Sequence, residues 1–153
     1  MIIYVSSWQS RGINPSNNAG SFTVQMPESF VAPKNTQLNG QWYLGLIDIT
    51  VASVNNRWSK GEVMYVTCPQ LEGSIVGDSY SPVLRAIPLG EIKRHNFARM
   101  QPVLYVPLRV SDVRHLSIEL RDSRGTLFPE LARETVQSTH CTLELTWKRD
   151  TNR

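Results

Sequence analysis

Histidines and carboxylates are the side chains of this chain that could support catalysis or metal binding. The three histidines, His95, His115 and His140, lie far apart, and no His-x-x-x-His or Cys-x-x-Cys spacing would build a metal shell from one element. No Gly-x-Ser-x-Gly and no phosphate-binding glycine-rich loop occurs. Any fold brings some carboxylates together, and nothing singles out a pair for acid–base work. The carboxylates considered are Asp48, Glu62, Glu72, Asp78, Glu119 and Asp122. The sequence therefore predicts no enzyme, no cofactor and no metal site.

The remaining nucleophilic side chains are two cysteines, Cys68 and Cys141. Each lies in a strand-like run, where a small apolar side chain packs well, so we expect buried free thiols rather than a disulfide or metal ligands. This usage fits a reducing, intracellular setting. His115 and His140 each precede a strand-like run, and we expect them to be partly exposed.

Aromatic residues on expected loops are the better candidates for function. Tryptophan, tyrosine and arginine are enriched among the residues that anchor protein interfaces. The alternative is that these aromatic side chains cover the ends of the fold as a minor core. The candidate subunit-interface residues are Trp8, Arg57, Trp58, Tyr80 and Phe97.

The charge pattern gives weak support for nucleic-acid binding. The chain has 16 basic and 13 acidic residues, and positive and negative charges are interleaved along the sequence, as is usual for an ordinary protein surface. The exceptions are a cluster at Lys93–His95 and a basic tail with Lys148, Arg149 and Arg153. A basic tail can contact a polyanion in a salt-dependent way, but each cluster has one aromatic residue nearby rather than a stacking series. We therefore expect at most weak nucleic-acid binding through the tail.

The sequence also argues against a membrane partner. Its first residues lack the basic n-region of a signal peptide. No apolar run reaches the ~20 residues that a membrane-spanning helix needs.

Eight short apolar runs, separated by turn-forming residues, must position these side chains. Such spacing is typical of an all-β sandwich or barrel. The run Gln41–Val51 is apolar on both faces, which predicts a strand in mid-sheet with cover on both sides. Only Phe128–Val136 has a helix-like spacing, and a single turn or a structured loop fits it equally well. The expected strands are Ile2–Ser7, Ser21–Pro27, Gln41–Val51, Val63–Cys68, Val83–Leu89, Leu104–Leu108, Leu116–Arg121 and Cys141–Lys148.

Long connections between several of these runs favour a Greek-key sandwich over an up-and-down barrel, because strands that change sheets need length to cross. A chain of this size is expected to form one domain that buries ~68–70% of its surface. We predict an all-β fold, a single eight-stranded jelly roll (Greek-key β-sandwich) over residues 1–153, with a short polar basic tail at 149–153.

Several motifs resemble one family of viral proteins in order and spacing. The most specific is Ile75-Val-Gly-Asp, which leads into Ser81-Pro-Val-Leu-Arg. The chain is similar in these motifs to the minor capsid (penton) protein of Polinton/Maverick elements and adintovirus-like viruses. The motifs that carry the resemblance lie in Gly40–Thr50, Val63–Cys68, Gly73–Pro88, Leu104–Leu108, Leu116–Gly125 and Thr142–Arg149.

The resemblance implies a structural virion protein without catalysis. It implies a single jelly roll that forms homopentamers at the vertices of an icosahedral capsid, whose faces are made by a double jelly-roll major capsid protein. Such a protein is made inside the host cell and ends in the virion. The alternative is a jelly-roll binding module for carbohydrate or peptide, because this architecture hosts many functions.

Overall fold

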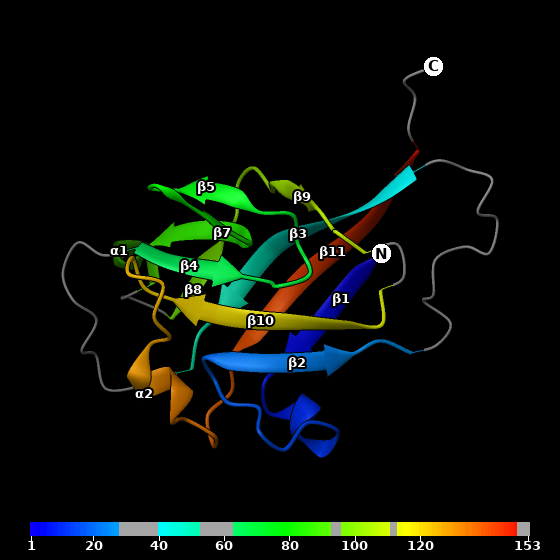
Figure 1. The fold of residues 1–153 in the computed structure, drawn as a ribbon. Helices are drawn as coiled ribbons and strands as arrows, with labels where there is room; N and C mark the ends of the chain where they lie inside the picture. The colour runs from blue at the N-terminus through cyan, green and yellow to red at the C-terminus, as the bar shows by residue number, and fades with distance from the viewer. Residues whose placement is uncertain (28–39, 53–62, 93–95, 111–112, 150–153) are drawn as a thin grey trace.

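Extended strands dominate the computed structural model, which describes residues 1–27, 40–52, 63–92, 96–110 and 113–149 (Figure 1). The helices among these residues are four-residue turns, η1 (Gln9–Gly12), α1 (Leu89–Ile92) and α2 (Pro129–Ala132). The all-β class is confirmed. The helix-like pattern at Phe128–Val136 forms the single turn α2, with proline at its first position.

The larger sheet is antiparallel and five-stranded. Its longest ladder joins β3 (Gly40–Thr50) to β11 (His140–Arg149) over nearly the full length of both strands. β8 (Phe97–Arg99) and β9 (Tyr105–Pro107) pair with different parts of β3, so together they form the edge opposite β1 (Ile2–Ser6). The order is β1, β11, β3 and β8, with β9 also on β3.

The second sheet has four antiparallel strands, and a two-stranded hairpin lies beside it. Its order is β2 (Ser21–Gln25), β10 (His115–Arg121), β4 (Val63–Thr67) and β7 (Val83–Pro88). The hairpin consists of β5 (Ser74–Val76) and β6 (Ser79–Ser81). All eight expected strands are therefore present. Three short strands, β5, β6 and β8, fall where the sequence predicted loops.

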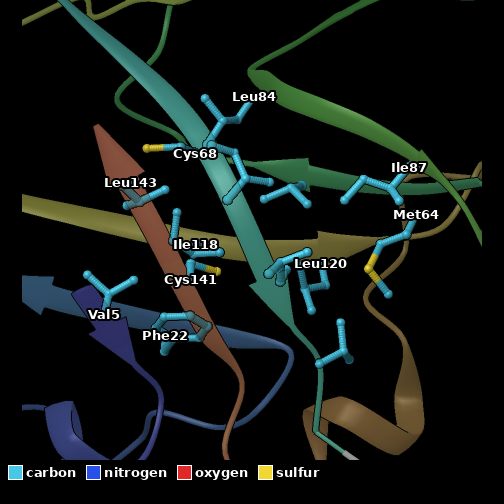
Figure 2. Close-up of a cluster of buried hydrophobic side chains, with 14 of the residues drawn as sticks. Val5, Phe22, Met64, Cys68, Leu84, Ile87, Ile118, Leu120, Cys141 and Leu143 are labelled. Carbon is cyan, nitrogen blue, oxygen red and sulfur yellow. The ribbon is translucent and has the colours of Figure 1, made fainter. Parts of the chain in front are cut away.

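A single hydrophobic core joins the two larger sheets (Figure 2). The alternating pattern of β10 places Leu116, Ile118 and Leu120 in it, as predicted. Cys68 and Cys141 are both buried free thiols, which confirms that expectation as well. Burial of each large aliphatic side chain contributes about 1.5–3 kcal/mol, so the core fixes the register of both sheets.

The apolar character of β3 has a different cause from the one predicted. The strand lies in mid-sheet, but its register with β11 shifts between Thr142 and Leu143, so Ile47 is an extra residue. This β-bulge reverses the alternation, and both Leu46 and Ile49 are buried on the core side. The outer face of β3 is covered near Gly45, where the side chains of Val103 and Tyr105 lie. The predicted mid-sheet position is therefore confirmed, cover of the outer face is local to Gly45, and the bulge accounts for the rest of the apolar run.

Candidate functional site: two apolar features on opposite edges

The hairpin β5–β6 presents an exposed apolar pair. Ile75 and Tyr80 face each other across the two strands, and they are 71% and 80% exposed. Their neighbours Ser74, Ser79 and Ser81 point to the other face, since strand side chains alternate. A two-stranded hairpin gains little stability alone in water, so such a pair in solvent is not explained by the fold of the monomer.

The turn of this hairpin depends on glycine. Gly77 has a φ of +63°, and it is the first of the two residues between β5 and β6. A two-residue hairpin loop with glycine at its first position is typical of a type II′ turn. The positive φ at that position is unfavourable for any residue that has a Cβ atom. The sequence Val-Gly-Asp-Ser therefore sets a tight turn that holds Ile75 beside Tyr80.

The base of the hairpin is fixed to the core. Leu71 is fully buried and forms an isolated bridge with Leu108. The amide of Cys68 donates to the carbonyl of Pro82 at 2.9 Å, and the amide of Glu72 donates to the carbonyl of Pro107, also at 2.9 Å. The hairpin therefore lies at the β7–β9 edge, and in Figure 1 β5 is near the top, whereas β2 is the lowest of the labelled strands.

An apolar groove lies at the opposite edge, between β1 and β2. Its volume is about 410 Å³. Ile13, which follows η1, is 66% exposed on its rim. The described side chains that line the groove include no charged group. Its lining is mostly apolar, with five polar residues among it: the apolar members are Met1, Ile2, Ile3, Tyr4, Val5, Ile13, Val24, Met26 and Pro27, and the polar ones are Ser6, Gln9, Ser10, Asn14 and Gln25.

A buried asparagine fixes the wall of this groove. The Asn17 Oδ1 accepts from the Thr23 amide at 3.0 Å, and its Nδ2 donates to the Thr23 carbonyl and to Ser10 Oγ, each at 2.9 Å. Asn14 Nδ2 also donates to the Thr23 carbonyl, at 3.0 Å. These bonds tie the polar segment that carries Ile13 to β2, so the groove is a built feature of the β1–β2 connection.

The structure places three of the predicted interface residues on separate elements. Trp8 precedes η1, is 55% exposed, and has the Arg11 guanidinium 5.8 Å from its ring centre. Tyr80 lies on the hairpin, and Phe97, 41% exposed, begins β8 opposite Thr50. Arg57 and Trp58 lie outside the described residues. Sequence reasoning missed Ile75 and Ile13, although the glycine turn between Ile75 and Tyr80 was a usable signal.

The basic tail begins on the outer face of the larger sheet. Lys148 Nζ lies 4.8 Å from the ring centre of Tyr43 and 5.3 Å from that of Tyr105. Tyr105 Oη donates to Glu144 Oε2 at 2.5 Å, and this bond raises the pKa of the phenol above its ordinary value. Arg149 ends β11, and Arg153 lies outside the described residues. The two tyrosines, Glu144 and Lys148 form what we call the tyrosine cluster.

Potential catalytic groups are dispersed. His115 and His140 are exposed at the starts of β10 and β11, as predicted, and His95 is not described. Burial raises the pKa of Cys68 to about 11 and that of Cys141 well above its usual range, so neither thiol is poised as a nucleophile. Within the described ranges, no three His, Cys, Asp or Glu side chains are grouped to hold a metal ion.

No helix in the described part of the chain is long and apolar enough to cross a membrane. Comparison with known proteins adds no identification, since no family model matches this chain and no curated protein matches it.

Proposed function

We propose that this protein is a structural virion protein, a minor capsid (penton) subunit that forms pentamers at the vertices of an icosahedral capsid. The proposal combines the resemblance to the penton proteins of Polinton/Maverick elements and adintovirus-like viruses with the order of the strands. The observation that carries it is the nested pairing of strands around one core.

The pairing supports a jelly roll. We count β8 and β9 as one interrupted strand and the β5–β6 hairpin as an insertion, which leaves eight strands. The first of these strands, β1, pairs with the last, β11. The remaining pairs are nested inside this one, β2 with β10, β3 with β8 and β9, and β4 with β7. One long antiparallel hairpin that rolls up on itself gives this order, which is that of a jelly roll, the architecture of many viral capsid domains.

The two edges of the sandwich support assembly into a closed ring. A five-fold ring needs heterologous contacts, in which one surface of each subunit meets a different surface of the next. The groove between β1 and β2 and the hairpin beside β7 and β9 are two different apolar features on opposite edges. A ring would cover both, whereas a monomer leaves both in water.

The proposed partners are further copies of this chain and a double jelly-roll major capsid protein. The side chain of Lys148 already faces two tyrosine rings, so a role of the tail in binding nucleic acid would be secondary.

The mass of the purified protein in solution tests this proposal. Light scattering across protein concentration and salt, followed by negative-stain images, should give a pentamer and five-membered rings. A strict monomer under all these conditions would contradict the penton assignment.

One observation favours the alternative, a binding module for carbohydrate or peptide. The tyrosine cluster places two aromatic rings beside a carboxylate and an ammonium group on an open sheet face. Such a surface can stack on a sugar ring while polar groups bind its hydroxyls. A monomer that binds a glycan array, and loses that binding in Tyr105→Ala, would favour this function over the capsid role.

A further inference from the structure

We propose that the hairpin of one copy inserts Ile75 and Tyr80 into the groove between β1 and β2 of the next copy. This inference rests on the self-assembly proposed above and names the contact that makes it. The β5–β6 hairpin is then the projecting half of each subunit boundary, and the groove is the receiving half.

The positions of the two features fit this contact. β1 and β2 are the edge strands on one side of the sandwich, and both line the groove. β7 and β9 form the other side. The base of the hairpin is bonded to β9, where the Glu72 amide donates to the Pro107 carbonyl, and to the end of β4, where the Cys68 amide donates to the Pro82 carbonyl. A projection and a recess on opposite edges of one chain produce a head-to-tail contact, which closes into a ring if the rotation allows.

The chemistry of the two surfaces also matches. The described lining of the groove carries no charged side chain, and the ammonium group of Met1, which also lines it, donates to the Leu145 carbonyl at 2.8 Å. The hairpin face that carries Ile75 and Tyr80 is apolar. The hairpin has its charge at the turn, on exposed Asp78. An unpaired carboxylate is costly to bury, so the hairpin lies along the groove with Asp78 beyond its end.

The size of the pair makes it an anchor rather than a whole interface. Burying a tyrosine removes roughly 150–250 Å² from water, whereas a stable interface buries about 800 Å² on each partner. Tyrosine in a desolvated pocket often dominates binding, while surrounding contacts exclude water. Loss of the pair should therefore abolish assembly although most of the boundary remains.

A charge swap tests the contact directly. Ile75→Glu on the hairpin and Ile13→Lys at the groove should each raise the protein concentration needed for assembly by at least about tenfold, because each places a charge in an apolar contact. The double variant Ile75→Glu/Ile13→Lys should regain rings, since the carboxylate of one copy then faces the ammonium of the next. Val136→Glu, at a residue that is 78% exposed and lies outside both features, is the matched control.

Light scattering of the four variants, with thermal unfolding to confirm that each is folded, separates the outcomes. Rings that persist in both single variants would overturn this inference and leave the penton proposal standing. A wild-type protein that is always monomeric would overturn the penton proposal itself, and this contact with it.

Cross-linking gives a second measurement that does not depend on rescue. A mixture of Tyr80→Cys and Ile13→Cys proteins should form a disulfide-linked dimer on mild oxidation, because Cys68 and Cys141 are buried and do not compete. A mixture of Val136→Cys and Ile13→Cys should stay uncrosslinked. Failure of the first mixture to cross-link at a protein concentration where light scattering shows that it assembles would reject the contact.

Discussion

The β3–β11 ladder and the β5–β6 hairpin are both antiparallel pairs with apolar side chains facing each other. These side chains are buried in the ladder and exposed to solvent in the hairpin. On β3 and β11, Leu44 and Leu145 pair across the strands and are almost completely buried. On the hairpin, Ile75 and Tyr80 pair in the same way and stand in water.

This difference separates side chains that stabilise the monomer from side chains available to a partner. Cross-strand pairs stabilise a sheet when a second layer covers them. The ladder has that layer, the four-stranded sheet across the core, whereas the hairpin gains one only when another molecule supplies it. The comparison predicts that substitutions in the ladder act on folding and that those in the hairpin act on assembly.

The largest loss of stability is expected at the ladder. Leu143→Ala removes a fully buried side chain from β11 and leaves a cavity, so the free energy of unfolding should fall by about 2–5 kcal/mol. Val136→Ala, at an exposed position, should change it by less than about 0.5 kcal/mol. Urea unfolding followed by tryptophan fluorescence measures both, and an equal effect of the two variants would contradict the assignment of the core.

The same comparison explains how far sequence reasoning reached. Strong alternation of apolar and polar residues predicted β10 and β11, because a register shift of one residue would expose all their apolar side chains to solvent. The bulge at Ile47 was not predictable, since it depends on the register with a strand almost a hundred residues later. For the hairpin the sequence pattern predicts a loop, because each of its strands has three residues, too few to show a period.

The candidate site was predictable only in part. Tyr80 could be selected as a loop aromatic, but its pairing with Ile75 requires the hairpin. The groove brings together β1, the polar segment with Ile13 and β2, and no local pattern marks a surface made by three segments. Sequence alone therefore indicated one half of the proposed contact.

The next largest effect is expected at the groove wall. Asn17→Ala removes three hydrogen bonds to Thr23 and Ser10. The Thr23 amide loses the acceptor that Asn17 supplied, whereas the Thr23 carbonyl keeps its bond from Asn14. The cost should be about 1–3 kcal/mol, with a loss of assembly because Ile13 is no longer held. Asn14→Ala, which removes the side-chain hydrogen bond to the Thr23 carbonyl, should cost less. A cost at Asn14 that equals or exceeds the cost at Asn17 would show that Asn17 does not hold the wall.

The buried thiols should make stability fall at high pH. Burial raises the pKa of Cys68 from its ordinary value of 9.0 to about 11. Between these values the unfolded chain loses the proton and the native protein keeps it, so stability present below pH 9 declines as the pH rises. The slope should be about 1 kcal/mol per pH unit for this thiol. Cys68→Ala should flatten the unfolding profile between pH 9 and 11, and an unchanged slope would contradict the assigned cause.

A smaller effect is expected at the hairpin turn. Gly77→Ala forces alanine into a left-handed conformation at a φ of +63°, which costs about 1–2 kcal/mol, but the strain is confined to β5 and β6. Amide exchange should therefore accelerate in Ser74–Ser81 and stay unchanged in β3 and β11. Gly12→Ala, where an added methyl meets no atom within 4 Å, is the control. Faster exchange throughout the molecule would show that the hairpin is part of the core.

The smallest effect on folding should be produced by removal of the exposed pair itself. Ile75→Ser/Tyr80→Ser deletes two large apolar side chains, yet both already stand in water, so the monomer should unfold within about 0.5 kcal/mol of the wild type. Assembly should be lost in the same sample, which separates this variant from Leu143→Ala. The measurement is denaturant unfolding at a concentration below that of assembly, beside light scattering above it. A stability loss as large as that of Leu143→Ala would mean that the pair supports the monomer, and the contrast between hairpin and ladder would then fail.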